Sequence, residues 1–354
     1  MPQKSKTARR KVKFFYSLKD IEENLCVKIP KDLYAVEKEY PVLVSEYYLN
    51  LINKNNIPDD PIWKQCIPDI SELSDSTSDE DPQCEKKYIS VPKLIHRYKD
   101  RALLLVTTRC TTQCRFCFRK RYWKQGTARQ DISDNELKNA INYLKTHPEI
   151  KEVLLSGGDP LILSNSKLDY ILNAVCSTGT IEVVRIASRV PVTNPARIND
   201  GFVKMLSKYD GVWVVTHFNH PNEVTHESMN ACKKIISAGI PVLNQTVLLK
   251  GINDNPEVLE KLFRSLIKNK IKPHYLFHVD PVKGVKHFAT GIEKGLEILR
   301  YFRKNLSSVA TPHFSIDLPE GGGKVSLQAS YSKDGISFES VDEKGIITYY
   351  PELK

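Results

Sequence analysis

Residues 102–117 read Ala102-Leu-Leu-Leu-Val-Thr-Thr108, then Arg109, then Cys110-Thr-Thr-Gln-Cys114-Arg-Phe-Cys117. The first half is an apolar run that is typical of a buried strand. The second half places three cysteines with Cys-x3-Cys-x2-Cys spacing in a short loop directly after that strand. Three thiolates can hold three irons of a 4Fe–4S cluster and leave the fourth iron open to a small molecule. Cys110, Cys114 and Cys117 are therefore the predicted cluster ligands.

The other cysteines do not form a second ligand group. Cys26, Cys66, Cys84, Cys176 and Cys232 show no mutual ligand spacing, and we interpret them as buried apolar residues. A structural zinc site usually takes four ligands, commonly two Cys-x2-Cys pairs, and the sequence has no second pair. The pattern therefore favours an iron–sulfur cluster over zinc.

The spacing resembles that of radical S-adenosylmethionine enzymes, in which the methionyl amino and carboxylate groups occupy the open iron. The resemblance implies S-adenosylmethionine as a second cofactor. The turn Ser156-Gly-Gly-Asp-Pro160 is common and by itself weak support, but its glycines let a ligand approach the backbone closely. At the matching place in that family the turn contacts the methionyl amino group, which implies Gly157, Gly158 and Asp159 as binding residues.

Short apolar runs alternate with amphipathic segments after residue 101, and this alternation predicts parallel βα units. The helix between the first two strands is expected to begin at the capping box Ser133-Asp-Asn-Glu136. Six units predict an α/β fold, a partial (β/α)6 TIM-like barrel with ligands at the carboxyl ends of its strands. The predicted strands are 102–108, 152–156, 182–187, 212–217, 241–248 and 274–279.

Polar residues follow two of these strands and are expected to face the same barrel mouth. We assign His217 and Gln245 to the S-adenosylmethionine site on this ground. The alternative is that both are structural, because a lone histidine or glutamine at a strand end more often has a partner within the protein.

The rest of the chain divides into three expected parts. Residues 1–95 are predicted to form a basic tail and a helical extension, with Val42–Ile52 as its best apolar segment and 71–82 as a polar linker. Residues 96–304 are expected to form the partial barrel. Residues 305–354 are expected to form a small C-terminal cap of short strands, including 346–350.

Composition narrows the class of protein. The chain has 354 residues, of which 41% are hydrophobic, so it can bury a sizeable core. It lacks an apolar run of roughly 18 residues and a secretory signal, which predicts a cytoplasmic protein without a membrane span. Six lysines and arginines before residue 14 supply +6 of the net charge of +10. Such a tail predicts at most weak, non-specific attraction to nucleic acid.

A second motif, Asp317-Leu-Pro-Glu-Gly-Gly-Gly-Lys324, contains the other candidate catalytic residue. A lysine after glycines could belong to a phosphate-binding loop, but Val325 stands where the Walker motif needs Ser or Thr. The alternative is a lysine that forms a Schiff base with an aldehyde cofactor, presented on a flexible glycine-rich arm.

With this motif the chain resembles the lysine 2,3-aminomutases over nearly everything after the basic tail. In that family the lysine of the glycine-rich motif carries pyridoxal 5′-phosphate, which implies Lys324 as the attachment point. The segment His96-Arg97-Tyr98-Lys-Asp-Arg101 matches the family's phosphate clamp. The resemblance therefore implies Arg97 and Arg101 as phosphate ligands and places Tyr98 close to the cofactor, although these arginines would otherwise be interpreted as exposed.

The resemblance also implies a substrate site. Arg119 matches the arginine that pairs with the substrate α-carboxylate, and Asp280 and Asp317 match the two aspartates that hold the ε-ammonium group of lysine. Paired carboxylates favour a cationic side chain. Relatives that act on glutamate replace these aspartates, and relatives that modify elongation factor P lack the Asp-x6-Lys arrangement. Arginine, ornithine and protein-linked lysine remain alternative substrates.

The implied activity is conversion of L-lysine to β-lysine by 1,2-amino migration, with an electron donor such as flavodoxin or ferredoxin. Glu320 departs from the family's Pro-Gly-Gly-Gly-Gly-Lys motif and is expected to stiffen the loop. The C-terminal cysteines that bind zinc between subunits in some relatives are not found here, so any homo-oligomer is expected to form without zinc. The rival interpretation, a nucleic-acid-associated iron–sulfur protein, rests on the basic tail alone.

Overall fold

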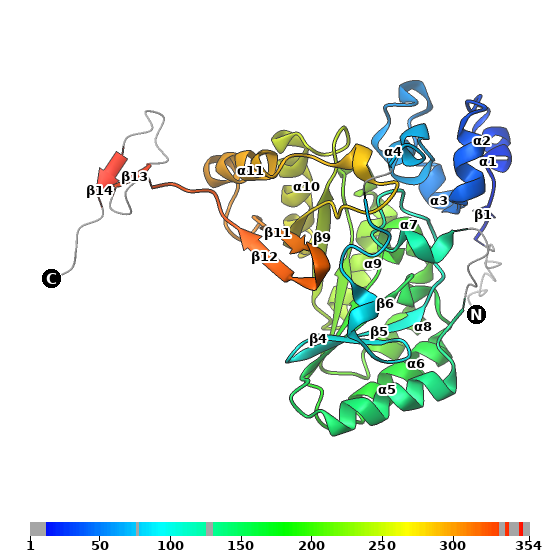
Figure 1. Cartoon of the computed structure of the whole chain (residues 1–354), viewed down its shortest axis with the longest axis vertical. Coiled ribbons are helices and arrows are strands. Elements are labelled where there is room, and N and C mark those ends of the chain that lie inside the picture. The colour runs from blue at the N-terminus through cyan, green and yellow to red at the C-terminus, as the bar shows by residue number, and fades with distance from the viewer. Residues whose placement is uncertain (1–11, 76–77, 125–129, 333–336, 340–346, 350–354) are drawn as a thin grey trace, which may run out of the picture.

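The computed structural model describes residues 12–75, 78–124, 130–332, 337–339 and 347–349. Its centre is a ten-stranded sheet with the strand order β12-β11-β10-β9-β8-β7-β6-β5-β4-β3 (Figure 1). The neighbours from β5 to β11 run parallel, whereas β3, β4 and β12 pair antiparallel at the two edges. The strands are β3 (Ile89–Val91), β4 (Leu94–Tyr98), β5 (Arg101–Thr107), β6 (Glu152–Gly157), β7 (Val183–Ala187), β8 (Val212–Thr216), β9 (Val242–Leu248), β10 (Lys272–His278), β11 (His313–Leu318) and β12 (Gly323–Leu327).

The six predicted strands are confirmed as β5 to β10, so the α/β class and the partial barrel are confirmed as well. The capping box also forms, because Glu136 N donates to Ser133 Oγ and the Glu136 carboxylate accepts from Ser133 N. The helices that follow the strands are α5 (Asp134–Thr146), α6 (Asn165–Cys176), α7 (Val190–Thr193), α8 (Asp200–Leu206), α9 (His226–Ser237), α10 (Pro256–Lys268) and α11 (Ile292–Asn305).

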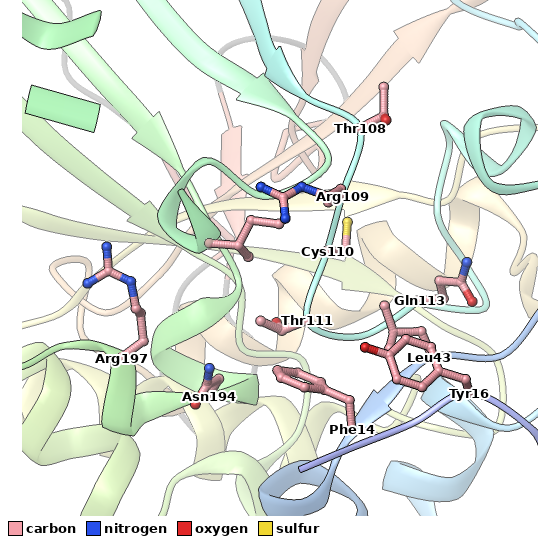
Figure 2. A pocket seen from close by; sticks show the side chains of 11 residues that line it. Phe14, Tyr16, Leu43, Thr108, Arg109, Cys110, Thr111, Gln113, Asn194 and Arg197 are labelled. Atoms are coloured by element: carbon pink, nitrogen blue, oxygen red, sulfur yellow. The ribbon is translucent and has the colours of Figure 1, made fainter. Parts of the chain in front are cut away.

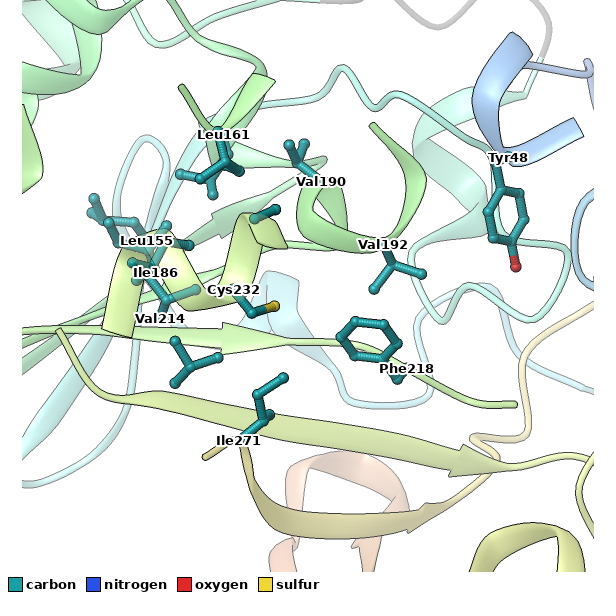
Figure 3. Close-up of a cluster of buried hydrophobic side chains, with 14 of the residues drawn as sticks. Tyr48, Leu155, Leu161, Ile186, Val190, Val192, Val214, Phe218, Cys232 and Ile271 are labelled. Atoms are coloured by element: carbon teal, nitrogen blue, oxygen red, sulfur yellow. The ribbon is translucent and has the colours of Figure 1, made fainter. Parts of the chain in front are cut away.

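The main core lies between the sheet and these helices. Leu155, Ile186 and Val214 come from neighbouring strands and are fully buried with Cys232 of α9 (Figure 3). Cys66 is also buried, as predicted. Cys26 is exposed, however, so its interpretation as a buried residue is wrong. Cys26 is the C-cap residue that follows α1 (Leu18–Leu25), and its backbone has the left-handed conformation.

The sheet extends beyond the predicted barrel at both edges. β11 pairs in parallel with β10, with His313 opposite Tyr275, and β12 folds back against β11. The segment expected to begin a separate cap therefore continues the barrel sheet as a seventh parallel strand. β13 (Ser337–Glu339) and β14 (Ile347–Tyr349) form their own antiparallel pair, which includes the predicted C-terminal strand.

Two tyrosines connect the two edges of the sheet. The backbone N–H of Lys324 on β12 donates to the Tyr98 hydroxyl of β4 at 2.9 Å, and the Tyr88 hydroxyl donates to the Gly321 carbonyl at 3.2 Å. Since β4 and β12 lie near opposite ends of the strand order, these bonds curl the sheet into a nearly closed ring.

The described part of the N-terminal extension contains α-helices that gather at one end of the barrel (Figure 1). The segment predicted as a polar linker, residues 71–82, includes buried acids among its described residues. Glu72 is fully buried, where it accepts from Arg115 at 2.9 Å and from Lys120 at 2.6 Å. No helix in the described part of the chain is long and apolar enough to cross a membrane. The α-helices that the structure describes in the N-terminal extension are α1, α2 (Leu33–Glu39), α3 (Glu46–Leu49) and α4 (Pro61–Cys66).

Candidate active site

A cavity of about 750 Å³ opens inside the partial barrel at the carboxyl ends of its strands. Every residue that the sequence predicted for the site lines it. They are Cys110, Cys114, Cys117, Gly157, Gly158, Asp159, His217, Gln245, Arg97, Tyr98, Arg101, Arg119, Asp280, Asp317 and Lys324. The cysteines and the lysine come from opposite ends of the sheet order, so the curl of the sheet brings the two motifs to one cavity.

The N-terminal extension holds the cysteine loop from behind. Arg115 N donates to the Gln65 carbonyl at 2.9 Å, and Gln113 N donates to the Leu43 carbonyl at 2.8 Å. The Arg115 side chain is fully buried in its ion pair with Glu72. These contacts fix the loop backbone on both sides of Cys114, and all three cysteines of the loop line the cavity.

The donor set of this loop fits a 4Fe–4S cluster. Cys110, Cys114 and Cys117 all line the cavity. In a 4Fe–4S cluster each thiolate binds a different iron, so three cysteines can hold three of the four irons. Arg189 Nη1 donates to Cys114 Sγ at 2.8 Å, so the loop sulfur is also held by a residue that follows the end of β7.

The glycine turn after β6 packs directly against the strand that leads into the cysteine loop. A Cβ atom on Gly157 would lie 2.2 Å from the Thr107 carbonyl oxygen, and one on Gly158 would lie 2.1 Å from the Arg109 carbonyl oxygen. Gly157 also has φ of 120°, a conformation that favours glycine. Both glycines are thus required by the backbone of this protein, whatever the turn binds.

The side chain of Asp159 serves the scaffold. Its two oxygens accept four hydrogen bonds, from Ser188 Oγ, Leu161 N, Arg189 N and Val190 N, at 2.6 to 3.1 Å. Burial raises the pKa of this carboxyl, and the hydrogen bonds oppose the rise. The carboxylate therefore ties the glycine turn to the end of β7, and its backbone is the part left to face a ligand.

His217 and Gln245 both line the cavity, as the strand-end pattern predicted. Burial, together with the charge of Arg189, lowers the pKa of His217 to about 3, so its ring is neutral near pH 7. The ring pairs with Asn219 at 3.1 Å and packs edge-on against Phe116. A neutral ring here can donate or accept a hydrogen bond but adds no charge to the site.

Lys324 occupies a regular strand, and the expected flexible arm is wrong for the residue itself. Its backbone pairs with Asp317 across the β11–β12 ladder and is held by Tyr98. The Nζ atom lies 4.3 Å from the ring centre of Tyr275 and 4.1 Å from that of Phe277. Burial lowers the pKa of Lys324 to about 8, against the opposing charge of Asp317. A lysine that is partly neutral near pH 7 is suited to nucleophilic attack on an aldehyde.

Two carboxylates face this lysine end of the cavity. Burial, and then the charge of Asp317, raise the pKa of Asp280 to about 7. Its one side-chain partner in the described part of the chain is Gln83, whose Nε2 donates to Oδ1 at 3.3 Å. A bound cation would relieve the repulsion between Asp280 and Asp317.

The predicted phosphate clamp also faces the cavity. Arg97 donates to the Gln83 carbonyl through Nη2, and its buried Nε has no partner among the described residues. Arg101 stacks on Tyr98, 3.9 Å from the ring centre, and pairs with Asp100. An unsatisfied guanidinium N–H beside a lysine fits the phosphate group of pyridoxal 5′-phosphate.

Residues 104–263 match the sequence profile of the Radical SAM superfamily. The chain is 45% identical to a putative L-lysine 2,3-aminomutase of Aquifex aeolicus over 90% of its length and 86% of that protein. It is 41% identical to the L-lysine 2,3-aminomutase of Clostridium subterminale over 89% of its length and 76% of that protein. The chain belongs to the lysine 2,3-aminomutase family. Enzymes of this family are isomerases that use a 4Fe–4S cluster, S-adenosylmethionine and pyridoxal 5′-phosphate.

Overall identity does not separate substrates within the lysine 2,3-aminomutase family. A glutamate 2,3-aminomutase of Clostridioides difficile is 41% identical over 81% of this chain and 68% of that protein. This value matches that of the lysine enzymes, so the choice between an anionic and a cationic substrate has to be argued from the cavity residues.

Among the cavity residues of this family member that the sequence analysis did not predict, Arg189, Gln83 and Glu85 make contacts that matter for the site. Arg189 touches Cys114 and could have been found by the strand-end rule that selected His217, because it follows β7. Gln83 and Glu85 carry no such signal, since they lie in a polar stretch without periodicity.

Glu85 changes the interpretation of Arg119. The Arg119 side chain is only 5% exposed, and its Nε donates to both Glu85 oxygens, at 3.0 and 3.1 Å. Nη1 donates to Ser156 Oγ at 3.0 Å. The guanidinium thus already has a carboxylate partner, and a substrate carboxylate would share it with Glu85.

A second cavity, of about 320 Å³, lies against the same cysteine loop. Cys110, Thr111 and Gln113 line both cavities, so this stretch forms a common wall. Figure 2 shows Arg109 and Phe14 facing the smaller space.

Proposed function

We propose that the chain is a radical S-adenosylmethionine, pyridoxal phosphate-dependent 2,3-aminomutase that converts L-lysine to β-lysine. The observation that carries the choice of lysine is the pair Asp280 and Asp317 beside Lys324. Two carboxylates beside a partly neutral lysine favour a substrate that brings its own positive charge. A glutamate side chain would add a third negative charge at the same place.

The protein's part in the reaction is to bind and orient. Cys110, Cys114 and Cys117 hold the cluster at one end, and the backbone of the glycine turn offers polar groups to S-adenosylmethionine beside it. When bound there, the cluster and S-adenosylmethionine would supply a carbon radical that removes a hydrogen atom from the substrate, while pyridoxal phosphate would assist the amino migration. Lys324 and Arg97 hold the pyridoxal phosphate at the other end, so the substrate lies between the two groups.

The electron donor and the cellular compartment of the enzyme are part of the same proposal. We infer that a one-electron donor such as a flavodoxin or ferredoxin reduces the cluster, and that the enzyme acts in the cytoplasm.

Anaerobic incubation with reductant, S-adenosylmethionine and single amino acids tests the proposal. We expect β-lysine from L-lysine and at least tenfold less product from arginine, ornithine or glutamate. Asp280→Asn and Asp317→Asn should lower the turnover of lysine far more than they lower cofactor loading. Formation of a β-amino product from glutamate would contradict the proposed substrate, and so would the absence of product with all four amino acids.

A further inference from the structure

A single segment, residues 79–88, contacts the charged groups at the lysine end of the cavity. We call it the rim segment. Asp79 bridges to Val282, two residues beyond Asp280. The opposite end of the rim segment is held by the bond between Tyr88 and the loop that precedes Lys324. Between these anchors lie Gln83 and Glu85, both of which line the cavity.

Gln83 joins two of the predicted binding groups. Its side-chain Nε2 donates to Asp280 Oδ1 at 3.3 Å, and its backbone carbonyl accepts from Arg97. The first contact depends on the side chain and the second does not. A substitution at Gln83 can therefore disturb the aspartate and leave the arginine contact in place.

The amide hydrogen bond has a direction that suits cation binding. It favours the ionised form of Asp280, against the burial that disfavours it. The amide oxygen of Gln83 makes no hydrogen bond in the described part of the chain. An ammonium group has three N–H donors, and each buried donor needs an acceptor. Asp280 and Asp317 supply two, and the oxygen of the Gln83 amide, which already contacts Asp280, is a candidate for the third.

We propose that Gln83 is a specificity-determining residue of this cavity, which fixes the orientation of Asp280 and supplies a third acceptor for the terminal ammonium group of the substrate. The inference rests on the proposed function, because it needs a cationic amino acid in the cavity. It adds to that function a residue outside both sequence motifs.

The test is a binding titration that does not require turnover. L-lysine is added to pyridoxal phosphate-loaded protein without reductant or S-adenosylmethionine, and the cofactor absorbance reports binding. For Gln83→Leu we expect the Kd of lysine to rise about tenfold, the loss of about 1.4 kcal/mol. The Kd of norleucine, which lacks the ammonium group, should change less than twofold. Gln130→Leu, an exposed site outside the cavity, is the matched control.

The outcomes separate the possible roles. Equal weakening of lysine and norleucine by Gln83→Leu would overturn the inference, because it would show general distortion. Loss of pyridoxal phosphate from the variant would also overturn it, since Gln83 would then act through Arg97. Gln83→Met, longer and more adaptable, replaces Gln83→Leu if thermal unfolding shows that the latter is misfolded. If the wild-type protein does not bind lysine, the proposed function itself fails.

Discussion

The two ends of the cavity, the cluster end at the cysteine loop and the lysine end at Lys324, differ in how many hydrogen bonds their charged side chains make within the protein. At the cluster end, Asp159 accepts four hydrogen bonds from the protein and Arg189 is bound by Glu223, Tyr48 and Gln65. At the lysine end, Asp280 has a single amide partner, and its pKa is raised to about 7. Lys324 lies against aromatic rings, with its pKa lowered to about 8.

This difference indicates where the protein itself supplies binding charge. At the cluster end, Asp159 and most of the Arg189 guanidinium are bound within the protein, so these two charges mainly serve the wall of the cavity. Charges at the lysine end lack full compensation within the protein, and this lowers the free energy of unfolding. Binding of a ligand of opposite charge would offset the loss. Each of the following experiments changes one end and leaves the other intact.

The largest expected effect is complete loss of cofactor attachment in Lys324→Ala. No other lysine lines the cavity among the described residues, so the variant should lack the absorption of bound pyridoxal phosphate. Borohydride reduction and peptide mapping should place the cofactor label on Lys324 in the wild type. Lys283→Ala, an exposed lysine outside the cavity, is the control. A label on any other lysine would contradict the assignment.

Replacing any one of Cys110, Cys114 and Cys117 with alanine should abolish S-adenosylmethionine cleavage. Each thiolate is one of only three protein ligands, so we expect loss of brown colour and of most iron. Pyridoxal phosphate loading should remain, since the lysine end is untouched. Cys176→Ala serves as a control in the same protein. Full iron content in all three cysteine variants would remove the cluster from this loop.

Asn substitutions at the two buried aspartates should change stability in opposite directions. Asp159→Asn replaces an acceptor with a donor that faces N–H groups, and we expect a loss of about 3 kcal/mol in the free energy of unfolding. Asp280→Asn removes a carboxylate whose ionisation is unfavourable in the fold. That cost is absent below about pH 4, grows as the pH rises to about 7 and is full above it.

Asp280→Asn should therefore match the wild type near pH 4 and exceed it at pH 8 by up to about 4 kcal/mol. Denaturant unfolding of both variants without ligands at the two pH values measures this. Destabilisation by Asp280→Asn at pH 8 would contradict this expectation, because it would show that the Asp280 carboxylate stabilises the fold as the Asp159 carboxylate does.

The smallest effect concerns the pH at which the lysine reacts. Attack on the aldehyde needs a neutral amine, so the rate of cofactor attachment should rise with pH and level off above about 8. The charge of Asp317 raises the pKa of Lys324, so Asp317→Asn should shift this midpoint to lower pH. Stopped-flow absorbance measures it. A shift to higher pH would mean that the two side chains do not interact as the structure places them.

Much of the barrel could be predicted because its strands are buried, apolar and local in sequence. β11 was missed because His313-Phe-Ser-Ile-Asp-Leu318 mixes polar and apolar residues, and only its pairing with β10 identifies it as a barrel strand. The rim segment was missed for another reason. Its acids are buried by arginines that lie more than 30 positions away, as Glu85 is by Arg119, and local patterns do not reveal such pairs.

The bond between Tyr98 and the Lys324 amide joins residues 226 positions apart. Contacts of such sequence separation form late, because a long loop has to close before they are gained. A refolding chain that has assembled β4 to β10 would present Arg97 and Arg101, the proposed phosphate ligands, and still lack Lys324. We therefore expect uptake of pyridoxal phosphate during refolding to lag behind the recovery of helical circular dichroism. The time of cofactor uptake would then report when Tyr98 and Lys324 join the two edges of the sheet.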